Sequence, residues 1–330
     1  MINFRQSIFF IFLHLNILIT VVIHTDLNNF NILNPILTIG VFDGVHLGHQ
    51  RVLDRLKEIA IKKDGESVVF TLWPHPRIVL DKDIDSLRLL NNIEEKKYLL
   101  SKTGIDHLII VPFTKEFSQL SACEFIEEYL VKKIKVKHLV IGYNHQFGKD
   151  RKAGFEFLNS CANKFGFSIE KLDAKLVDND TVSSTKIREF LASGELGIAN
   201  NYLGYEYFIS GNVVEGNQIG RKIGFPTANI KIPEPYKQVP KDGVYAVRVR
   251  LNGESFFGML NIGTRPTIES IPDSKNIEVH ILEFDQKIYN QTVTVTFVKR
   301  IRDEKKFNNL EDLTKQLEKD KSEVTQLFGL

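Results

Sequence analysis

Two histidines, His46 and His49, lie three positions apart just after a short apolar run that ends at Gly40. The run predicts a β-strand, and the apolar positions that follow His49 repeat with the period of a helix. At the start of a helix, imidazole and backbone N–H groups can both donate hydrogen bonds to a phosphate chain, and they could stabilise the charge on a departing pyrophosphate. The two histidines alone are equally consistent with a helix cap beside a solvated side chain, and a metal pair is a further alternative.

The residues around the histidines make the phosphate-binding interpretation more specific, because residues 40–49 read GVFDGVHLGH. Glycines in such a turn let the backbone approach a nucleotide closely. His46 and His49 are candidate catalytic residues. The nucleotide-binding candidates are Gly40, Phe42, Asp43, Gly44 and Gly48.

A second segment with phosphate-binding chemistry, SSTKIR, occupies residues 183–188. The hydroxyls of Ser184 and Thr185 can cap a helix, and Arg188, one turn later, offers a planar donor fork to phosphate oxygens. Taken alone, this pattern is more often plain helix capping. Together with the histidine turn, it indicates the second half of one nucleotidyltransferase site, with Arg188 as a catalytic candidate.

The last third of the chain has a glycine-rich stretch of a different kind. Residues 211–221 read GNVVEGNQIGR, in which Gly216, Gly220 and Arg221 could surround phosphates with N–H groups. The stretch lacks the Gly-Lys-Ser/Thr ending of a P-loop, so a plain hairpin loop is the alternative.

Three oxygen-bearing side chains follow this stretch. Thr227 and Asn229 are two neutral oxygen ligands two residues apart, which suit a Mg²⁺ ion that keeps several waters. Glu278 lies in a later strand-like run, where an isolated glutamate is usually just solvated.

The elements that would position these residues change character near Gly204. Before it, strand-like runs at 35–40, 68–72, 107–111, 138–141 and 168–172 alternate with helical stretches at 93–102, 121–134, 154–165 and 186–192. This alternation predicts an α/β domain with a parallel sheet between helices. After it, short strand-like runs at 207–214, 243–251, 254–262, 277–284 and 292–300 precede a helix at 310–328. They predict a small antiparallel β-barrel followed by a C-terminal helix.

Length and composition narrow the class of protein. A chain of 330 residues exceeds what one core usually needs, so we expect domains at 20–204 and 205–330. With 43 basic and 41 acidic residues, the net charge of +2 is too small for a broad surface that binds nucleic acid. Cys123 and Cys161 cannot form a disulfide framework, and we expect both to be small core residues in a reducing, cytoplasmic compartment.

Residues 1–19 form an extra apolar segment. From Ile8 to Ile23, thirteen of sixteen residues are apolar. This run is shorter than the roughly 20 residues of a membrane-spanning helix, and it lacks the basic start and the cleavage site of a signal peptide. We therefore expect no membrane association. The favoured interpretation is that residues 1–19 are upstream translation and that residues 20–25 form the first strand.

Taken together, the motifs resemble those of the HxGH nucleotidyltransferases, and their order resembles the bacterial bifunctional riboflavin kinase/FAD synthetase family. The resemblance covers about residues 21–320. Further segments that carry it are TLWPHP at 71–76, IGYNHQFG at 141–148, PTAN at 226–229, NIGTRPT at 261–267 and EVH at 278–280. It implies a Rossmann-like nucleotidyltransferase domain and a kinase barrel, with riboflavin, FMN and ATP as substrates and Mg²⁺ as cofactor.

The resemblance also implies individual roles. The histidine pair would contact ATP phosphates, residues 183–188 would complete that phosphate site, and Asn144 would help to hold the nucleotide or flavin phosphate. Glu278 would be the kinase carboxylate that accepts the proton of a primary hydroxyl. The chain departs from the family pattern at Val41, Leu72, His145 and Asn290.

Two other functions stay open at this point. One is a nucleotidyltransferase for another phosphorylated acceptor, which the PTAN motif and the barrel disfavour. The other is a membrane-attached flavin- or nucleotide-binding protein without catalysis, suggested by the apolar N-terminal run. The presence of both histidines, Arg188 and Glu278 argues against it.

Overall fold

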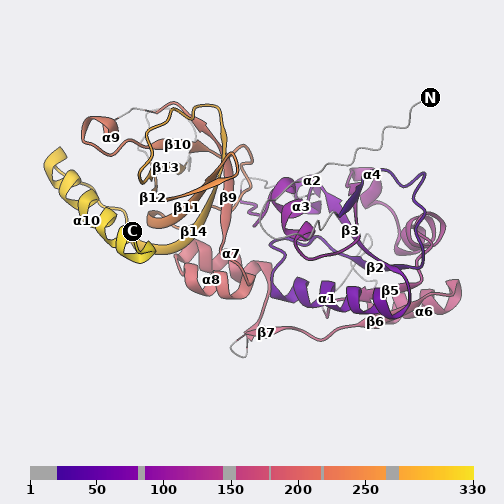
Figure 1. The fold of residues 1–330 in the computed structure, drawn as a ribbon. Helices are drawn as coiled ribbons and strands as arrows, with labels where there is room; N and C mark the ends of the chain where they lie inside the picture. The colour runs from indigo at the N-terminus through magenta and orange to yellow at the C-terminus, as the bar shows by residue number, and fades with distance from the viewer. Residues whose placement is uncertain (1–20, 81–85, 144–153, 178–179, 217–218, 265–274) are drawn as a thin grey trace, which may run out of the picture. The chain divides into compact units, whose positions relative to one another are not determined.

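The computed structural model describes residues 21–80, 86–143, 154–177, 180–216, 219–264 and 275–330. The chain forms two compact units, coloured along the sequence in Figure 1. The first comprises residues 1–87 and 91–183, and the second comprises Arg88–Leu90 and residues 184–330. Gly204 therefore lies inside the second unit.

The first unit is built on a six-stranded sheet in the order β1-β4-β3-β2-β5-β6, in which every pair is parallel. The strands are β1 (Val22–His24), β2 (Pro35–Ile39), β3 (Glu66–Trp73), β4 (His107–Pro112), β5 (His138–Ile141) and β6 (Ser168–Lys171). The inner strands are continuous runs of buried residues, as expected for a parallel sheet covered on both faces. The predicted parallel α/β domain is confirmed.

The chain order reverses at β2, because β3 lies on one side of it and β5 on the other. Open α/β sheets bind ligands outside the carboxyl ends of their strands at such a reversal point. The histidine turn follows β2 directly and therefore occupies the place where this topology favours a ligand.

The helices of the first unit are α1 (Leu47–Lys62), α2 (Pro76–Leu80), α3 (Ile93–Ser101), α4 (Lys115–Ser118), α5 (Ala122–Phe125) and α6 (Phe155–Phe165). Ser121 caps α5 in a reciprocal capping box with Glu124. Beyond Phe125 the predicted helix continues as a π-helix, η1 (Ile126–Lys133), whose last turn places Ile134 N 2.9 Å from Tyr129 O. Two short strands, β7 (Leu176–Val177) and β8 (Asp180–Thr181), pair antiparallel before the next helix.

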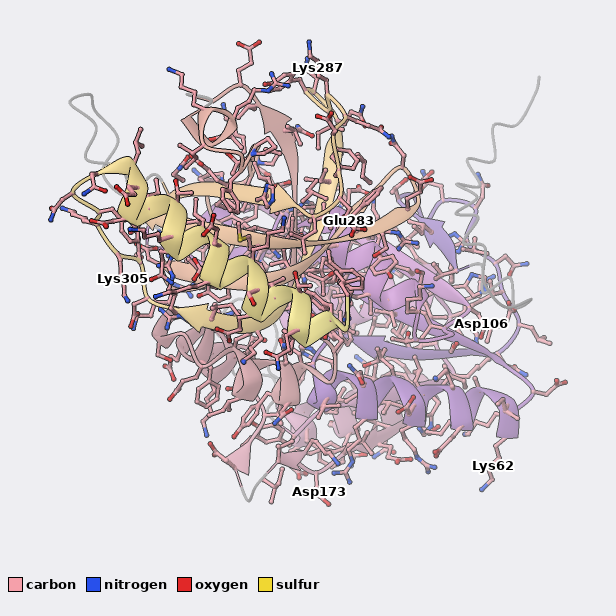
Figure 2. All side chains as sticks on the ribbon, turned by 60° about the vertical axis from the view of Figure 1, so that its left-hand side comes forward. Lys62, Asp106, Asp173, Glu283, Lys287 and Lys305 are labelled. Carbon is pink, nitrogen blue, oxygen red and sulfur yellow. The ribbon has the colours of Figure 1, made fainter. Side chains whose placement is uncertain are left out.

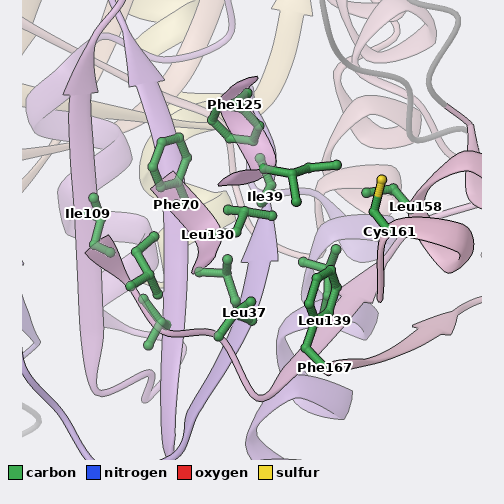
Figure 3. Close-up of a cluster of buried hydrophobic side chains, with 14 of the residues drawn as sticks. Leu37, Ile39, Phe70, Ile109, Phe125, Leu130, Leu139, Leu158, Cys161 and Phe167 are labelled. Atoms are coloured by element: carbon green, nitrogen blue, oxygen red, sulfur yellow. The ribbon is translucent and has the colours of Figure 1, made fainter. Parts of the chain in front are cut away.

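The core of the first unit packs strand side chains against α6 and the α5–η1 helix. Figure 3 shows Leu37, Phe70 and Leu139 from the sheet among Phe125, Leu130 and Leu158. Cys161 belongs to this core and is 7% exposed, as predicted. The prediction was wrong for Cys123, which is exposed because it lies in the first turn of α5, on a side directed to solvent.

The second unit contains a closed antiparallel barrel in the order β10-β13-β12-β11-β14-β9. Its strands are β9 (Phe208–Val214), β10 (Ala228–Lys231), β11 (Gly243–Leu251), β12 (Glu254–Thr264), β13 (Lys275–Ile281) and β14 (Thr292–Arg302). Helices α7 (Ser184–Ser193) and α8 (Leu196–Leu203) precede it, α9 (Ile219–Lys222) follows β9, and α10 (Leu310–Phe328) ends the chain. The predicted barrel and terminal helix are confirmed.

Two buried charged side chains hold the second unit together. Asp320 on α10 is 2% exposed and accepts hydrogen bonds from Arg302 of β14, with Nη2 2.7 Å from Oδ2. Lys237 is 3% exposed and donates to the carbonyls of Leu90, at 2.5 Å, and Phe208, at 3.1 Å. The short segment Arg88–Leu90 is therefore bonded into the unit that contains the barrel.

The surface shows positive and negative side chains side by side. Figure 2 labels lysines such as Lys62 and acidic residues such as Asp173 at separate places, and Lys315 pairs with Glu311 at 2.7 Å. This mixture agrees with the small net charge of +2. Within the described ranges, from Val21 onward, no helix combines the length and the apolar character needed to cross a membrane.

Candidate active sites

The histidine turn is the passage from β2 into α1. His46 is the N-cap of α1, with extended backbone angles, and its Nδ1 accepts a hydrogen bond from His49 N at 3.4 Å. The two imidazole rings stack, with centroids 3.7 Å apart and planes inclined by 19°. His46 thus caps the helix and stands beside His49 at its start, so the capping and phosphate-binding interpretations are compatible.

His49 lies among groups that keep it uncharged. Burial lowers the pKa of His49 well below its usual value, and the charges of His46 and Lys96 lower it further. Its Nδ1 is buried and makes no hydrogen bond. A neutral imidazole still carries one N–H, so His49 can donate to a phosphate oxygen without being a fixed cation.

The turn itself is conformationally strained. Phe42 and Val45 have φ of 50° and 38°, in the left-handed region that non-glycine residues rarely adopt, and Gly44 between them has φ of 86°. A Cβ at Gly40 would lie 3.0 Å from the ring of Phe42, and one at Gly48 would lie 3.1 Å from the ring of His46. These two glycines make room for aromatic rings, and their predicted nucleotide contacts stay predictions.

The start of α3 is bonded to this turn. Asn91 Oδ1 accepts from Gly44 N at 2.9 Å, and Asn91 N donates to Asp43 Oδ1 at 3.3 Å. Asn92 then caps α3 in a capping box with Glu95. Asn91 is not among the residues predicted from sequence, although the N-x-x-E pattern at 92–95 could have located the helix start beside it.

Lys96, one turn into α3, is a second residue that the sequence analysis missed. It is 1% exposed, and its Nζ lies 4.9 Å from the centroid of the Trp73 ring. Burial lowers the pKa of Lys96 to about 8, while the charge of Asp43 acts in the opposite direction. A lysine is rarely buried this completely.

The second phosphate-binding segment begins α7. Arg188 Nη2 donates to Thr185 Oγ1 at 3.1 Å, within the first turns of this helix, which starts at Ser184. In the first unit, the chain passes the histidine turn at Val182, whose carbonyl oxygen would be 3.8 Å from a Cβ at Gly48. The turn thus lies next to the residues that lead into α7. Asn144 lies outside the described residues.

In the second unit, glycines again mark close approaches. A Cβ at Gly216 would lie 2.1 Å from Asn229 Nδ2, and one at Gly220 would lie 2.2 Å from the carbonyl oxygen of Phe225. Phe225 N also donates to Gly220 O at 2.8 Å, which folds the glycine-rich stretch against the PTAN segment. Gly216 and Gly220 therefore lie close to the segment that carries the proposed metal ligands.

The register of the barrel brings the three oxygen-bearing residues together. Asn229 in β10 pairs with Glu278 in β13, and Thr227 Oγ1 donates to Glu278 Oε2 at 3.3 Å. The other carboxylate oxygen, Oε1, accepts from Asn276 Nδ2 at 2.7 Å. A hydroxyl, an amide and one carboxylate at one place form an oxygen donor set of the kind that Mg²⁺ accepts alongside waters.

His280 is hydrogen-bonded to the backbone of the PTAN segment. Its Nδ1 lies 2.7 Å from the carbonyl oxygen of Pro226 and must carry the proton, because a carbonyl only accepts. His280 is 8% exposed, and burial lowers its pKa. The EVH motif in the sequence predicts no role for this histidine.

A cavity opens beside these residues. Arg221 and residues 226–228 form one part of its lining, and residues 284–289 form another. The remaining members are Val213, Val279 and Ile281. Apolar walls with a few polar groups are typical of small-molecule sites. Arg221 thus lies where it can contact a bound anionic ligand.

Comparisons with known proteins give separate matches for the part of the chain with the histidine turn and for the part with the barrel. A family model described as FAD synthetase matches residues 31–186, and one described as riboflavin kinase matches residues 203–328. Among solved structures, the crystal structure of a macrolide-efflux protein from Streptococcus pneumoniae is similar, with a TM-score of 0.82 and 31% identity. The match covers 93% of this chain and 98% of that one.

Curated relatives cover both halves at once. The bifunctional riboflavin kinase/FMN adenylyltransferase of Listeria monocytogenes is 39% identical over 90% of this chain and 93% of its own length. Those of Haemophilus influenzae and Escherichia coli K12 are 42% and 37% identical, each over 89% of this chain and 94% and 93% of their own lengths. The chain belongs to the bifunctional riboflavin kinase/FMN adenylyltransferase family.

Proposed function

We propose that this chain phosphorylates riboflavin to FMN with one ATP and then adenylylates FMN with a second ATP, giving FAD and pyrophosphate. The observation that carries the proposal is the pairing of a histidine turn at a sheet reversal point with a Glu278–Thr227–Asn229 cluster in a barrel. The family membership of both halves supports it.

For the kinase step, Glu278 accepts the proton of the primary hydroxyl of riboflavin while that oxygen attacks the γ-phosphorus of ATP. The bond from the γ-phosphorus to the bridging oxygen breaks, and ADP leaves. Asn276 and Thr227 each donate to one carboxylate oxygen, which fixes the orientation of the base. Thr227 and Asn229 would hold Mg²⁺, which supplies charge neutralisation at the phosphates when bound.

For the adenylyl transfer, a phosphate oxygen of FMN attacks the α-phosphorus of the second ATP, and the bond to the β-phosphate breaks. His46 and His49 donate hydrogen bonds to the phosphate chain and stabilise the charge on the departing pyrophosphate. The start of α7 binds the same ATP phosphates through Ser184, Thr185 and Arg188. Neither step needs a covalent enzyme intermediate, because positioning and charge stabilisation suffice.

The direct test incubates purified protein with riboflavin, ATP and Mg²⁺ and separates the flavins by chromatography over time. We expect FMN to form first and FAD to follow, with one pyrophosphate released per FAD. Supplying FMN should bypass the first step. Formation of FMN without FAD, together with transfer of AMP to a different phosphorylated acceptor, would contradict the second half of the proposal.

The Mg²⁺ requirement is tested by replacing Mg²⁺ with excess chelator, which should abolish both reactions. A cytoplasmic location stays a prediction, as does the absence of a nucleic-acid or membrane partner.

A further inference from the structure

One peptide group, which joins Leu90 to Asn91, is hydrogen-bonded at both ends to charged residues. Its carbonyl oxygen belongs to Leu90 and accepts from Lys237 Nζ at 2.5 Å. Its N–H belongs to Asn91 and donates to Asp43 Oδ1 at 3.3 Å. Asp43 lies in the histidine turn, whereas Lys237 follows β10, among the residues that match riboflavin kinase. A single peptide group therefore connects a residue of the kinase half to the turn proposed for adenylyl transfer.

Lys237 is held at this carbonyl by further contacts. It is 3% exposed, its Nζ also donates to Phe208 O at 3.1 Å, and the same atom lies 4.7 Å from the centroid of the Tyr207 ring. The hydroxyl of Tyr207 donates to the Leu90 carbonyl oxygen at 3.1 Å. The neighbouring Leu89 pairs with Lys237 in a parallel β-bridge. The carbonyl thus has fixed donors in an interior where hydrogen bonds are stronger than in water.

The other end of the peptide group is fixed as well. Asp43 is 5% exposed, and Asn91 adds a second bond to the turn, because its Oδ1 accepts from Gly44 N at 2.9 Å. The peptide is planar and trans, so its C=O and N–H point in opposite directions. In their ordinary ionisation states Lys237 is a cation and Asp43 an anion, so both polarise the peptide in the same direction and strengthen the two bonds.

The backbone of the turn needs such support. Phe42 and Val45, which flank Asp43 in the turn, have positive φ angles of 50° and 38°. Non-glycine residues keep such angles only where the surrounding structure holds them. His46 directly follows Val45, so relaxation of the turn would displace its imidazole.

We propose that Lys237 is a positioning residue of the adenylyl transfer: through the peptide group between Leu90 and Asn91, it fixes Asp43 and the turn that carries both histidines. The inference rests on the proposed function of that turn. It makes one activity depend on a residue from the part of the chain that matches the other, since displacing catalytic groups by about 1 Å can cost about 10²-fold in rate.

The first experiment measures both activities of the full chain in Lys237→Met, which removes the amino group and keeps most of the apolar stem. We expect kcat for FAD formation from FMN to fall about tenfold or more, because the histidines are displaced. Riboflavin phosphorylation should keep its rate, since Asn276 and Thr227 still orient Glu278. Unchanged FAD formation in Lys237→Met would overturn the proposal.

Lys275→Met is the matched control. Lys275 is another lysine of the second unit whose Nζ donates to a backbone carbonyl, that of Pro240, at 2.9 Å. Its substitution should leave both rates unchanged. If Lys275→Met slows FAD formation as much as Lys237→Met does, the proposal is overturned.

The second experiment asks whether Lys237 acts through Asp43. Asp43→Ala removes the acceptor of the Asn91 N–H, so adding Lys237→Met to this variant should slow FAD formation by less than about twofold further. If the two effects multiply in the double variant, Lys237 acts by another route and the proposal is overturned.

The third experiment detects the displacement of the histidines by NMR in the full chain labelled with ¹⁵N-histidine, with signals assigned from His→Ala variants. Lys237→Met should shift the signals of His46 and His49 and leave those of His138 in β5 and His280 in the barrel in place. Shifts of all four signals would indicate general loosening and would count against the proposal.

Loss of both activities in Lys237→Met indicates misfolding. Tyr207→Phe, which removes only the hydroxyl that donates to the same carbonyl, then replaces it in all three experiments, and loss of both activities there too overturns the proposal. If His46→Ala and His49→Ala leave FAD formation intact, the proposed function of the turn fails. If they slow it and the Lys237 and Tyr207 variants do not, this inference alone fails.

Discussion

The two units build their sites in different ways. In the first, a parallel sheet delivers the histidines to a strained turn at the end of β2, and the start of α3 holds that turn by hydrogen bonds. In the second, an antiparallel register sets Asn229 opposite Glu278, and neighbouring side chains orient the carboxylate. Imidazole and backbone N–H donors gather at the first site and oxygen acceptors at the second.

This difference shows that each site depends on a separate local feature. The first needs its unusual backbone angles and the docking of α3, whereas the second needs the pairing of β10 with β13. Substitutions should therefore remove one activity and spare the other, and the variants below test that separation.

The largest expected effect is that of Glu278→Gln on the kinase step. The substitution keeps size and most hydrogen bonding but removes the proton acceptor, so riboflavin phosphorylation should fall by about 10²–10⁴-fold. Adenylylation of supplied FMN should stay near the unaltered rate. Thr227→Ala and Asn229→Ala serve as controls that should raise the Mg²⁺ concentration needed. Riboflavin phosphorylation at an unchanged rate in Glu278→Gln would show that this carboxylate is merely solvated.

The reciprocal variants are His46→Ala and His49→Ala. Each removes one donor to the phosphate chain, so FAD formation from FMN should slow by roughly 10²-fold. Riboflavin phosphorylation, measured in the same preparation, should be untouched. An equal loss of both activities would indicate misfolding, and normal FAD formation would exclude the histidines from the reaction.

A smaller effect is expected from His280, which sharpens the comparison within the barrel. In His280→Asn the amide nitrogen can replace Nδ1 as donor to the Pro226 carbonyl, whereas His280→Gln places its amide nearer the position of Nε2. We expect His280→Gln to lower kcat for riboflavin phosphorylation by about fivefold and His280→Asn to restore most of it, because a lost hydrogen bond to the PTAN segment is worth about 1 kcal/mol. Equal rates in the two variants would show that this bond does not position the segment.

The smallest effect concerns stability and tests the boundary between the units. We expect fragments 184–330 and 205–330 both to phosphorylate riboflavin. Fragment 205–330 loses α7 and α8, including the bond from Tyr207 N to Asn200 Oδ1 at 2.9 Å and that from Lys241 N to Leu191 O at 2.9 Å. Its melting temperature should be lower by about 5 °C or more, as for a loss of at least 1 kcal/mol.

Equal melting temperatures of fragments 184–330 and 205–330 would place the boundary between the units at Gly204, where the sequence predicted it. A folded fragment 184–330 without kinase activity would contradict the assignment of the barrel.

The sequence predicted much of this fold because most elements carry a strong apolar pattern. Five barrel strands and the terminal helix were recognised from their runs, but β10 was not, since Ala228–Lys231 is four residues long with polar Asn229 and Lys231. The histidine turn was recognised because its residue types are unusual together. Lys96 was missed because a lysine on a short helix normally faces solvent, and its burial depends on Trp73 and Asp43, which are distant in sequence.

The segment Arg88–Leu90 can form its hydrogen bonds only after later parts of the chain have been synthesised. Its carbonyl at Leu90 bonds to Lys237, 147 residues later in the chain, and Tyr207 donates to the same carbonyl at 3.1 Å. During synthesis on the ribosome, these three residues therefore wait until β9 and β10 have emerged before their partners exist. The two units are also joined by more than a single linker, so exchanging the barrel with that of another family member would require carrying this tripeptide along with it.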